Sequence, residues 1–154
     1  HLLDSIAIVP YVAGAQTVID VGTGGGLPGI PVAIACPGLS VTLLDTIAKK
    51  TTFVRQAVSE LQLTNATVVT ERVESYHPST KFDLVISRAF AELKDFAEAA
   101  AHLAREGGKL LAMKGVYPHE EIARLPNAFR VSDVYPLRVP GLDAQRHLVV
   151  IEKN

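Results

Sequence analysis

Cysteine is nearly absent from this sequence, because Cys36 is the only one in 154 residues. A single cysteine excludes an intrachain disulfide and a cysteine-rich zinc site, so we expect no bound metal and a reducing compartment such as the cytoplasm. Long apolar runs are also absent, since none reaches the roughly 18 residues needed to span a bilayer. The first residues lack the basic segment of a signal peptide. We therefore expect a soluble protein without a membrane partner.

An excess of charge of one sign is missing as well. Fifteen Lys and Arg residues stand against sixteen Asp and Glu residues, and the formal net charge is −1. No overall field attracts a polyanion, so binding to a nucleic acid would need a local basic patch. The length and the 48% hydrophobic content are those of one packed unit. We expect a single domain over residues 1–154, present as a monomer.

What the sequence does contain is an alternation of short apolar runs and helical patterns, with no linker or repeat between them. This alternation predicts a parallel sheet covered by helices, as in Rossmann-like α/β folds. The five runs that predict strands are residues 17–21, 40–45, 66–71, 82–87 and 109–114. Two further strands, at 129–139 and 146–153, have no helical pattern between them. They predict an antiparallel C-terminal hairpin on the sheet edge, and thus a seven-stranded, mostly parallel sheet.

Helices are predicted between these strands. The first begins at about Pro28, and the next covers 46–63 with Thr46 as its N-cap. The apolar face expected for this second helix consists of Phe53, Val54, Ala57, Val58 and Leu61. After residue 87, apolar residues recur at helical spacing over 93–103, and we expect this helix to end at the Gly107–Gly108 pair.

The stretch "VIDVGTGGGLPGIPVAIA" places a glycine-rich turn directly after the first predicted strand. Gly24, Gly26 and Gly29 match G-x-G-x-x-G, while Gly22, Gly24 and Gly26 match a tighter G-x-G-x-G. The turn opens a helix, and Asp45 follows about 20 residues later at the end of the second strand. Such a turn lets the backbone approach a ligand, and an acidic group at that distance can accept both ribose hydroxyls of an adenosine.

Two cofactor classes fit this turn, a dinucleotide and S-adenosylmethionine. A pyrophosphate needs free N–H groups at the helix start, whereas Pro28 and Pro31 remove two of them. This favours S-adenosylmethionine and a methyltransferase. The alternatives are a nicotinamide-dependent oxidoreductase that uses the same loop and a non-enzymatic assembly factor that binds RNA.

A more specific resemblance runs from residue 1 to about residue 153. The segments that carry it, in order, are "HLLDSI", "DVGTGGGLPGIPVAI", "LLD", "RVES", "FDLVISRAFA", "MKG" and "GLDAQRHLVVI". They resemble the bacterial small-subunit (16S) ribosomal RNA guanine-N7 methyltransferases, also called the glucose-inhibited division protein B family. We expect the chain to lack the helical segment that this family carries at its N-terminus.

The resemblance implies a class I methyltransferase that uses S-adenosylmethionine, with 16S ribosomal RNA or the small ribosomal subunit as its partner. It places cofactor contacts at Gly22, Leu27, Val73, Glu74 and Arg88. Chemically, Glu74 or its neighbouring backbone would lie by the adenine, and Asp45 by the ribose. Arg88 would hold the methionine carboxylate or reach the RNA. The alternatives are a solvated carboxylate at Glu74 and a surface ion pair at Arg88.

Formation of 7-methylguanosine places simple demands on the protein. The N7 atom of guanine has a free lone pair and no proton to remove, so we expect no general base. Alignment of nitrogen, methyl and sulfur is then the main task, and we assign positioning to Arg88 and Lys114. Further substrate-side candidates are Lys49, Lys50, Phe90, Arg146 and His147. The structural alternatives are a solvated face for the two lysines, core packing for the phenylalanine and a structural hydrogen bond for the histidine.

Overall fold

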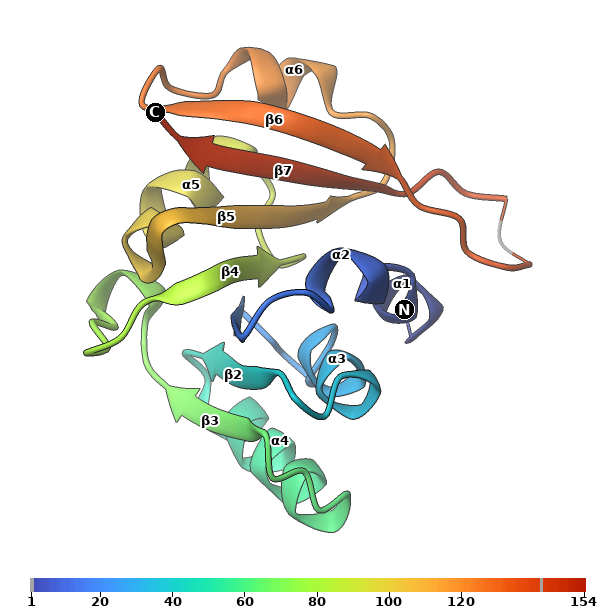
Figure 1. The fold of residues 1–154 in the computed structure, drawn as a ribbon, viewed down its shortest axis with the longest axis vertical. Helices are drawn as coiled ribbons and strands as arrows, with labels where there is room; N and C mark the ends of the chain where they lie inside the picture. Colours follow the sequence, from blue (N-terminus) through green and yellow to red (C-terminus); the bar gives the residue numbers. More distant parts are fainter. Residues whose placement is uncertain (1, 142) are drawn as a thin grey trace.

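A single seven-stranded sheet organises the computed structural model, which describes residues 2–141 and 143–154 (Figure 1). The strands are β1 (Thr17–Val21), β2 (Ser40–Asp45), β3 (Ala66–Thr70), β4 (Phe82–Ser87), β5 (Ala104–Lys114), β6 (Phe129–Pro136) and β7 (His147–Lys153). Their order in the sheet is β3-β2-β1-β4-β5-β7-β6. Strands β1 to β5 pair in parallel, while β7 pairs antiparallel with both β5 and β6. The predicted fold class and its C-terminal hairpin are therefore confirmed.

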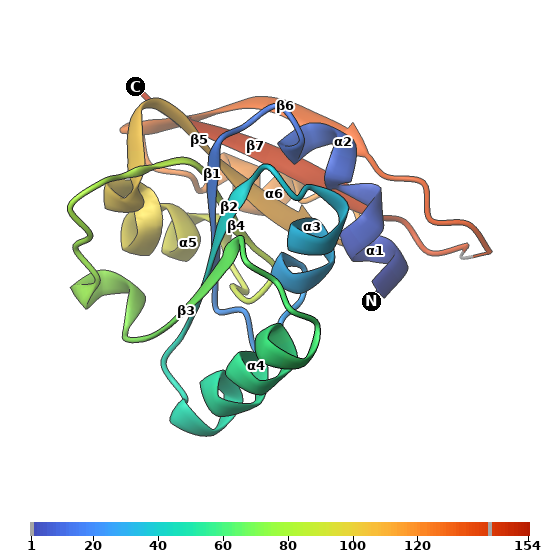
Figure 2. The same cartoon turned by 60° about the horizontal axis from the view of Figure 1, so that its bottom comes forward.

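The two faces of the sheet are covered by different helices. One face carries α1 (Leu2–Ala7), α2 (Val9–Val12), α3 (Gly29–Ala35) and α4 (Ala48–Glu60). The other carries η1 (Val73–Ser75), α5 (Leu93–Ala100), η2 (Ala101–Leu103) and α6 (His119–Ala123). Figure 2 shows α3 and α4 on one side of the sheet and α5 on the other. His1 and Leu142, which belong to two segments of the family resemblance, lie outside the described residues.

The core consists of two apolar clusters, one against each face. Neighbouring residues of a strand point to opposite faces, so Val18 belongs to the cluster under α3 and Ile19 to the cluster under α5. Both side chains are fully buried. Because both faces are covered, strands β1, β2 and β4 carry buried apolar residues at adjacent positions, which explains why their predicted bounds are correct.

Strand β5 begins earlier than predicted. The expected helix to Gly107–Gly108 is wrong, because α5 ends at Ala100 and the chain pairs with β4 from Ala104 onward. The Arg105 guanidinium contacts the Asp83 carboxylate at 2.6 Å next to this early start. Gly107, at a φ of +78°, makes the ladder irregular instead of capping a helix.

Helix α4 also differs from its prediction. It begins at Ala48, and Thr46 does not cap it; the Asp45 carboxylate instead accepts a hydrogen bond from the Ile47 N–H. Its inward face is narrow. Val54 is fully buried, whereas Phe53 is 59% exposed, so the predicted apolar face is correct only in part. Leu61, also expected on that face, follows the helix and is half exposed.

Candidate functional site

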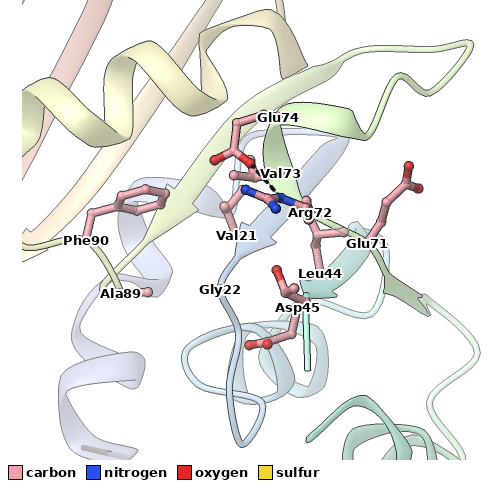
Figure 3. A pocket seen from close by; sticks show the side chains of 11 residues that line it. Val21, Gly22, Leu44, Asp45, Glu71, Arg72, Val73, Glu74, Ala89 and Phe90 are labelled. Carbon is pink, nitrogen blue, oxygen red and sulfur yellow. Dashed lines mark ion pairs between the residues drawn. The ribbon is translucent and has the colours of Figure 1, made fainter. Parts of the chain in front are cut away.

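A pocket lies at the carboxyl ends of β1, β2 and β4, where the strand order reverses between β1 and β4 (Figure 3). Open α/β sheets bind their ligands at this kind of position, because the loops on either side of the reversal diverge there. The pocket has a volume of about 310 Å³. It is lined by Val21, Gly22, Leu44, Asp45, Thr46, Glu71, Arg72, Val73, Glu74, Ala89 and Phe90.

The glycine-rich turn borders this pocket through Gly22. Gly22, Gly24 and Gly26 have φ values of +71°, +57° and +98°, a region that side chains disfavour. At Gly22 a Cβ atom would lie 2.7 Å from the Cβ of Ala89. Glycine is therefore required at position 22 for two reasons, the positive φ of the turn and the close approach of the loop after β4.

Asp45 closes the pocket at the end of β2, as the sequence predicted. Its Oδ2 accepts a hydrogen bond from the Gly24 N–H at 2.8 Å, and its Oδ1 accepts one from the Ile47 N–H at 3.0 Å. Each carboxylate oxygen can accept more than one hydrogen bond, so capacity remains for two ribose hydroxyls. The residue thus holds the glycine turn and faces the pocket at the same time.

Asp20 is a buried carboxyl that the sequence analysis did not single out. Its Oδ2 accepts hydrogen bonds from the Thr23 hydroxyl at 2.7 Å and from the Gly29 N–H at 2.9 Å. Burial raises the pKa of Asp20 to about 7, although those two hydrogen bonds and the nearby Arg88 charge act in the opposite direction. The Asp20 carboxyl therefore connects the two ends of the glycine turn, at Thr23 and Gly29, from the buried side. Its position two residues before Gly22, the first glycine of the motif, was the available signal.

Val73 and Glu74 lie on η1, at the rim of the pocket. The Glu74 carboxylate faces Arg72 at 3.7 Å in an ion pair whose two side chains are mostly exposed. Figure 3 shows this pair above the pocket, with Asp45 on the opposite side. Solvent screens such a pair, so it holds the Glu74 side chain only weakly. The backbone of residues 73–74 forms the rim of the pocket.

Two of the predicted cofactor residues face elsewhere. Gly26 and Leu27 lie on the other side of the glycine turn and line a separate apolar groove with Ile30, Ile34 and Phe53. Gly24 contributes to the site through its bond to Asp45 and not as a lining residue. The turn therefore brings Gly22 and Asp45 together and directs Leu27 away from them.

Arg88 and Lys114 line a second cleft beside the pocket, of about 210 Å³. The other lining residues are Asp4, Met113, Gly115, Leu137, Arg146 and His147. Arg146 is held by the Asp4 carboxylate at 3.3 Å, and His147 Nδ1 lies 2.7 Å from the Gly115 carbonyl oxygen. The structure thus groups three of the predicted substrate-side residues with Arg88.

The remaining substrate-side candidates are divided. Phe90 lines the first pocket and also packs on Phe96, with ring centroids 5.4 Å apart. Lys49 and Lys50 are exposed on α4, away from the second cleft. Among the described residues no three His, Cys, Asp or Glu side chains come together as a metal site would require. Within the same residues no helix is long and apolar enough to cross a membrane.

The chain is similar to proteins of one family along nearly its whole length. The family model of GidB, described as rRNA small subunit methyltransferase G, matches residues 1–149. Proteins named ribosomal RNA small subunit methyltransferase G from Aromatoleum aromaticum and Neisseria gonorrhoeae are 59% and 55% identical to this chain. Both matches cover 100% of this chain and 75% and 74% of the respective relatives.

Solved structures with the same fold are methyltransferases of low sequence identity. One is a SAM-dependent methyltransferase from Thiobacillus denitrificans in complex with S-adenosyl-L-homocysteine, with a TM-score of 0.70 and 10% identity. The match covers 99% of this chain and 90% of that chain. Another is TrmN from Thermus thermophilus, with a TM-score of 0.75 and 19% identity over 97% of this chain and 48% of that chain.

Proposed function

The chain belongs to the GidB family of rRNA small subunit methyltransferases, and we propose that it transfers the methyl group of S-adenosylmethionine to N7 of a guanine in 16S ribosomal RNA. The observation that carries the proposal is a pocket that brings Gly22 of the glycine-rich turn together with the Asp45 carboxylate at the end of β2, in a chain 59% identical to a named relative. The oxidoreductase and the non-enzymatic assembly factor find no support among the relatives.

The residues of the pocket fit an adenosine-containing cofactor. Asp45 offers free lone pairs for the ribose hydroxyls, and the backbone of Val73 and Glu74 offers a rim for the adenine. The apolar side chains of Val21, Leu44 and Phe90 suit a flat ring. Pro28, at the start of α3, has no N–H to give to a pyrophosphate, which supports a ligand without phosphates.

Arg88 stands between the two hollows, because it lines the second cleft while its neighbour Ala89 lines the pocket. We assign to it the methionine carboxylate or the RNA, since a guanidinium binds either anion and stays charged at every physiological pH. The target guanine would then enter the second cleft, beside Arg146 and His147.

The reaction in this arrangement is an in-line displacement. When bound, S-adenosylmethionine supplies an electrophilic methyl group on a sulfonium. The lone pair of guanine N7 needs no deprotonation, so the residues of the chain have only to orient the two reactants and exclude water. Because guanine N7 carries no proton, no base is required in this step; Asp20 lies outside the pocket lining, and His147 holds its Nδ1 against the Gly115 carbonyl.

The test is methyl incorporation from labelled S-adenosylmethionine into 16S ribosomal RNA, offered both as naked RNA and as small subunits, followed by mapping of 7-methylguanosine. Calorimetric titration with S-adenosylhomocysteine and with NADH separates the cofactor classes. Binding of S-adenosylhomocysteine and label at N7 of one guanine are expected. NADH binding without S-adenosylhomocysteine binding, or label on another base atom, would contradict the proposal.

We further propose that the enzyme acts as a cytoplasmic monomer with a single domain. All seven strands belong to one sheet, and both cores span it, which supports a single folding unit. Sedimentation of the purified protein across a range of concentrations tests the oligomeric state. A mass that rises with concentration to that of a dimer would overturn the monomer.

A further inference from the structure

Lys114, at the end of β5, turns its ammonium group into the protein instead of toward a ligand. Its Nζ donates hydrogen bonds to the carbonyl oxygens of Phe90 and Ala91, both at 3.1 Å. It also lies 2.9 Å from Oε1 of Glu121 on α6. An ammonium has three N–H groups, and here three acceptors surround it. The side chain is 12% exposed, which leaves little room for a phosphate.

Glu121 completes this arrangement from the opposite side. Its Oε1 accepts a hydrogen bond from the Leu93 N–H at 3.0 Å, at the start of α5, and contacts Lys114 at the same time. The Glu121 side chain is 20% exposed. The ion pair therefore connects three backbone groups of the segment 90–93 to the end of β5 and to α6.

The segment that this pair holds forms part of the cofactor pocket. Ala89 and Phe90 line the pocket, and Ala89 closely approaches Gly22 of the glycine turn. At the other end of the segment, the Ser87 hydroxyl donates to the Val21 carbonyl at 2.7 Å and accepts from the Ala89 N–H at 3.0 Å. The segment is thus fixed by Ser87 before the pocket residues and by Lys114 and Glu121 after them.

We propose that Lys114 and Glu121 are positioning residues that shape the cofactor pocket by holding the segment 88–93. This inference rests on the proposed function, because it takes the pocket to be the S-adenosylmethionine site. Neither side chain lines the pocket, so both act through Ala89 and Phe90. The role differs from the one predicted for Lys114 from the sequence, since it acts on the cofactor wall and involves α6.

The energetics of the pair explain why both partners are needed. Two partly buried charges lose hydration, and this loss is compensated only while they face each other and their backbone partners. Without the ammonium, the Glu121 carboxylate and the carbonyls of Phe90 and Ala91 lose their shared donor and move toward water. The wall formed by Phe90 then moves with them, and the pocket loses its preformed shape.

The first experiment compares Lys114→Met with Lys109→Met, which lies exposed on the same strand. Methionine keeps most of the apolar stem of lysine and removes its charge. Calorimetry should show affinity for S-adenosylhomocysteine on the order of tenfold weaker for Lys114→Met and unchanged for Lys109→Met. Amide hydrogen exchange should become faster in peptides covering 88–93 and stay the same in β1 and β2.

Lys114→Arg keeps the positive charge and its donors, so its affinity should lie between that of Lys114→Met and that of the wild type. In methyl-transfer assays the KM for S-adenosylmethionine should rise in Lys114→Met while the KM for RNA stays constant. Wild-type affinity in Lys114→Met, or a change in the KM for RNA alone, would overturn the inference. If the wild-type protein itself fails to bind S-adenosylhomocysteine, the proposed function fails instead.

A second pair of variants keeps the test decisive if Lys114→Met does not fold. Glu121→Gln retains an oxygen acceptor for the Leu93 N–H but loses the charge that faces Lys114. Glu120→Gln is the matched control, because the Glu120 side chain is 90% exposed and its ion pair with Arg124 is long, at 4.0 Å. Affinity should fall several-fold for Glu121→Gln and stay constant for Glu120→Gln. Equal affinities for the two variants would refute the role of α6.

Discussion

The glycine-rich turn separates two hollows of opposite character. On one side lies the pocket of about 310 Å³, with Asp45, Glu71 and Glu74 among its lining residues. On the other lies the apolar groove of about 460 Å³ between α1, α3 and α4, lined largely by side chains such as Ile34 and Phe53. The groove is larger, yet none of the described residues that line it is charged, so none of them would orient a polar cofactor. Polar groups at defined positions, and not volume, make the pocket beside Asp45 the proposed ligand site.

The glycine-rich turn contributes residues to both the pocket and the groove. Gly22 faces the pocket and lies against Ala89, whereas a Cβ at Gly26 would contact the Ile30 side chain in the groove. The turn places Gly22 at the pocket and Leu27 at the groove. Substitutions on the two sides should therefore have different consequences.

The largest effect is expected at Gly22. Gly22→Val places a branched side chain at a φ of +71° and within 2.7 Å of the Ala89 Cβ, so it distorts both walls of the pocket. We expect affinity for S-adenosylhomocysteine to fall by at least about a hundredfold, measured by calorimetry, because strain and lost ligand volume add. Gly14→Ala is the control, since a Cβ there meets nothing within 4 Å. Unchanged binding by Gly22→Val would place the ligand outside this pocket.

Asp45→Asn should have the next largest effect. The amide keeps the shape of the carboxylate but loses charge-assisted acceptance, both for the Gly24 N–H and for the ribose hydroxyls. The expected loss in cofactor affinity is about 1.5–3 kcal/mol. Affinity for RNA, measured by filter binding, should stay the same. A loss confined to RNA binding would mean that Asp45 serves the other ligand.

Asp20 should make stability depend on pH. Its pKa is about 7 in the folded protein against 3.8 as the reference value, so the unfolded chain releases this proton first as the pH rises. The contribution of Asp20 to stability is therefore complete below about pH 4 and is lost as the pH rises through 7. Between these limits the free energy of unfolding of the wild type should fall by at least about 1 kcal/mol relative to Asp20→Asn. Denaturant titrations at several pH values measure this difference, and parallel curves would contradict it.

The smallest effect is expected in the groove. Phe53 is 59% exposed, so Phe53→Ser should change the free energy of unfolding by less than about 1 kcal/mol and leave cofactor affinity unchanged. Its neighbour Val54 is fully buried, and Val54→Ala should cost about 2 kcal/mol through the cavity it leaves. Thermal and denaturant unfolding compare the two variants. Loss of S-adenosylhomocysteine binding in Phe53→Ser would make the groove part of the site.

Much of the fold could be predicted because its signals are local. The runs that form β1, β2 and β4 are apolar on both faces and end at a glycine, an acidic residue or a serine. The glycine turn and Asp45 lie at the ends of adjacent strands, so their meeting follows from the parallel pairing of β1 and β2. Family resemblance added Val73 and Glu74, which do line the pocket.

The errors concern features that depend on distant partners. The extension of β5 to Ala104 depends on pairing with Phe82 of β4, and the narrow inward face of α4 depends on how that helix packs over β2 and β3. Periodicity alone shows which residues share a face and does not show how much of that face a neighbour covers.

The sequence by itself determined the order of the seven strands along the chain, the positions that need glycine and the class of cofactor, because these depend on propensity and on short spacings. Only the tertiary structure decided that Leu27 faces the groove, that Asp20 is buried with a raised pKa, and that Lys114 meets Glu121 and the carbonyls of the segment after β4. The physical reason is that burial and hydrogen-bond partnership arise between segments far apart in the chain, and no local pattern of residues encodes the distance between them.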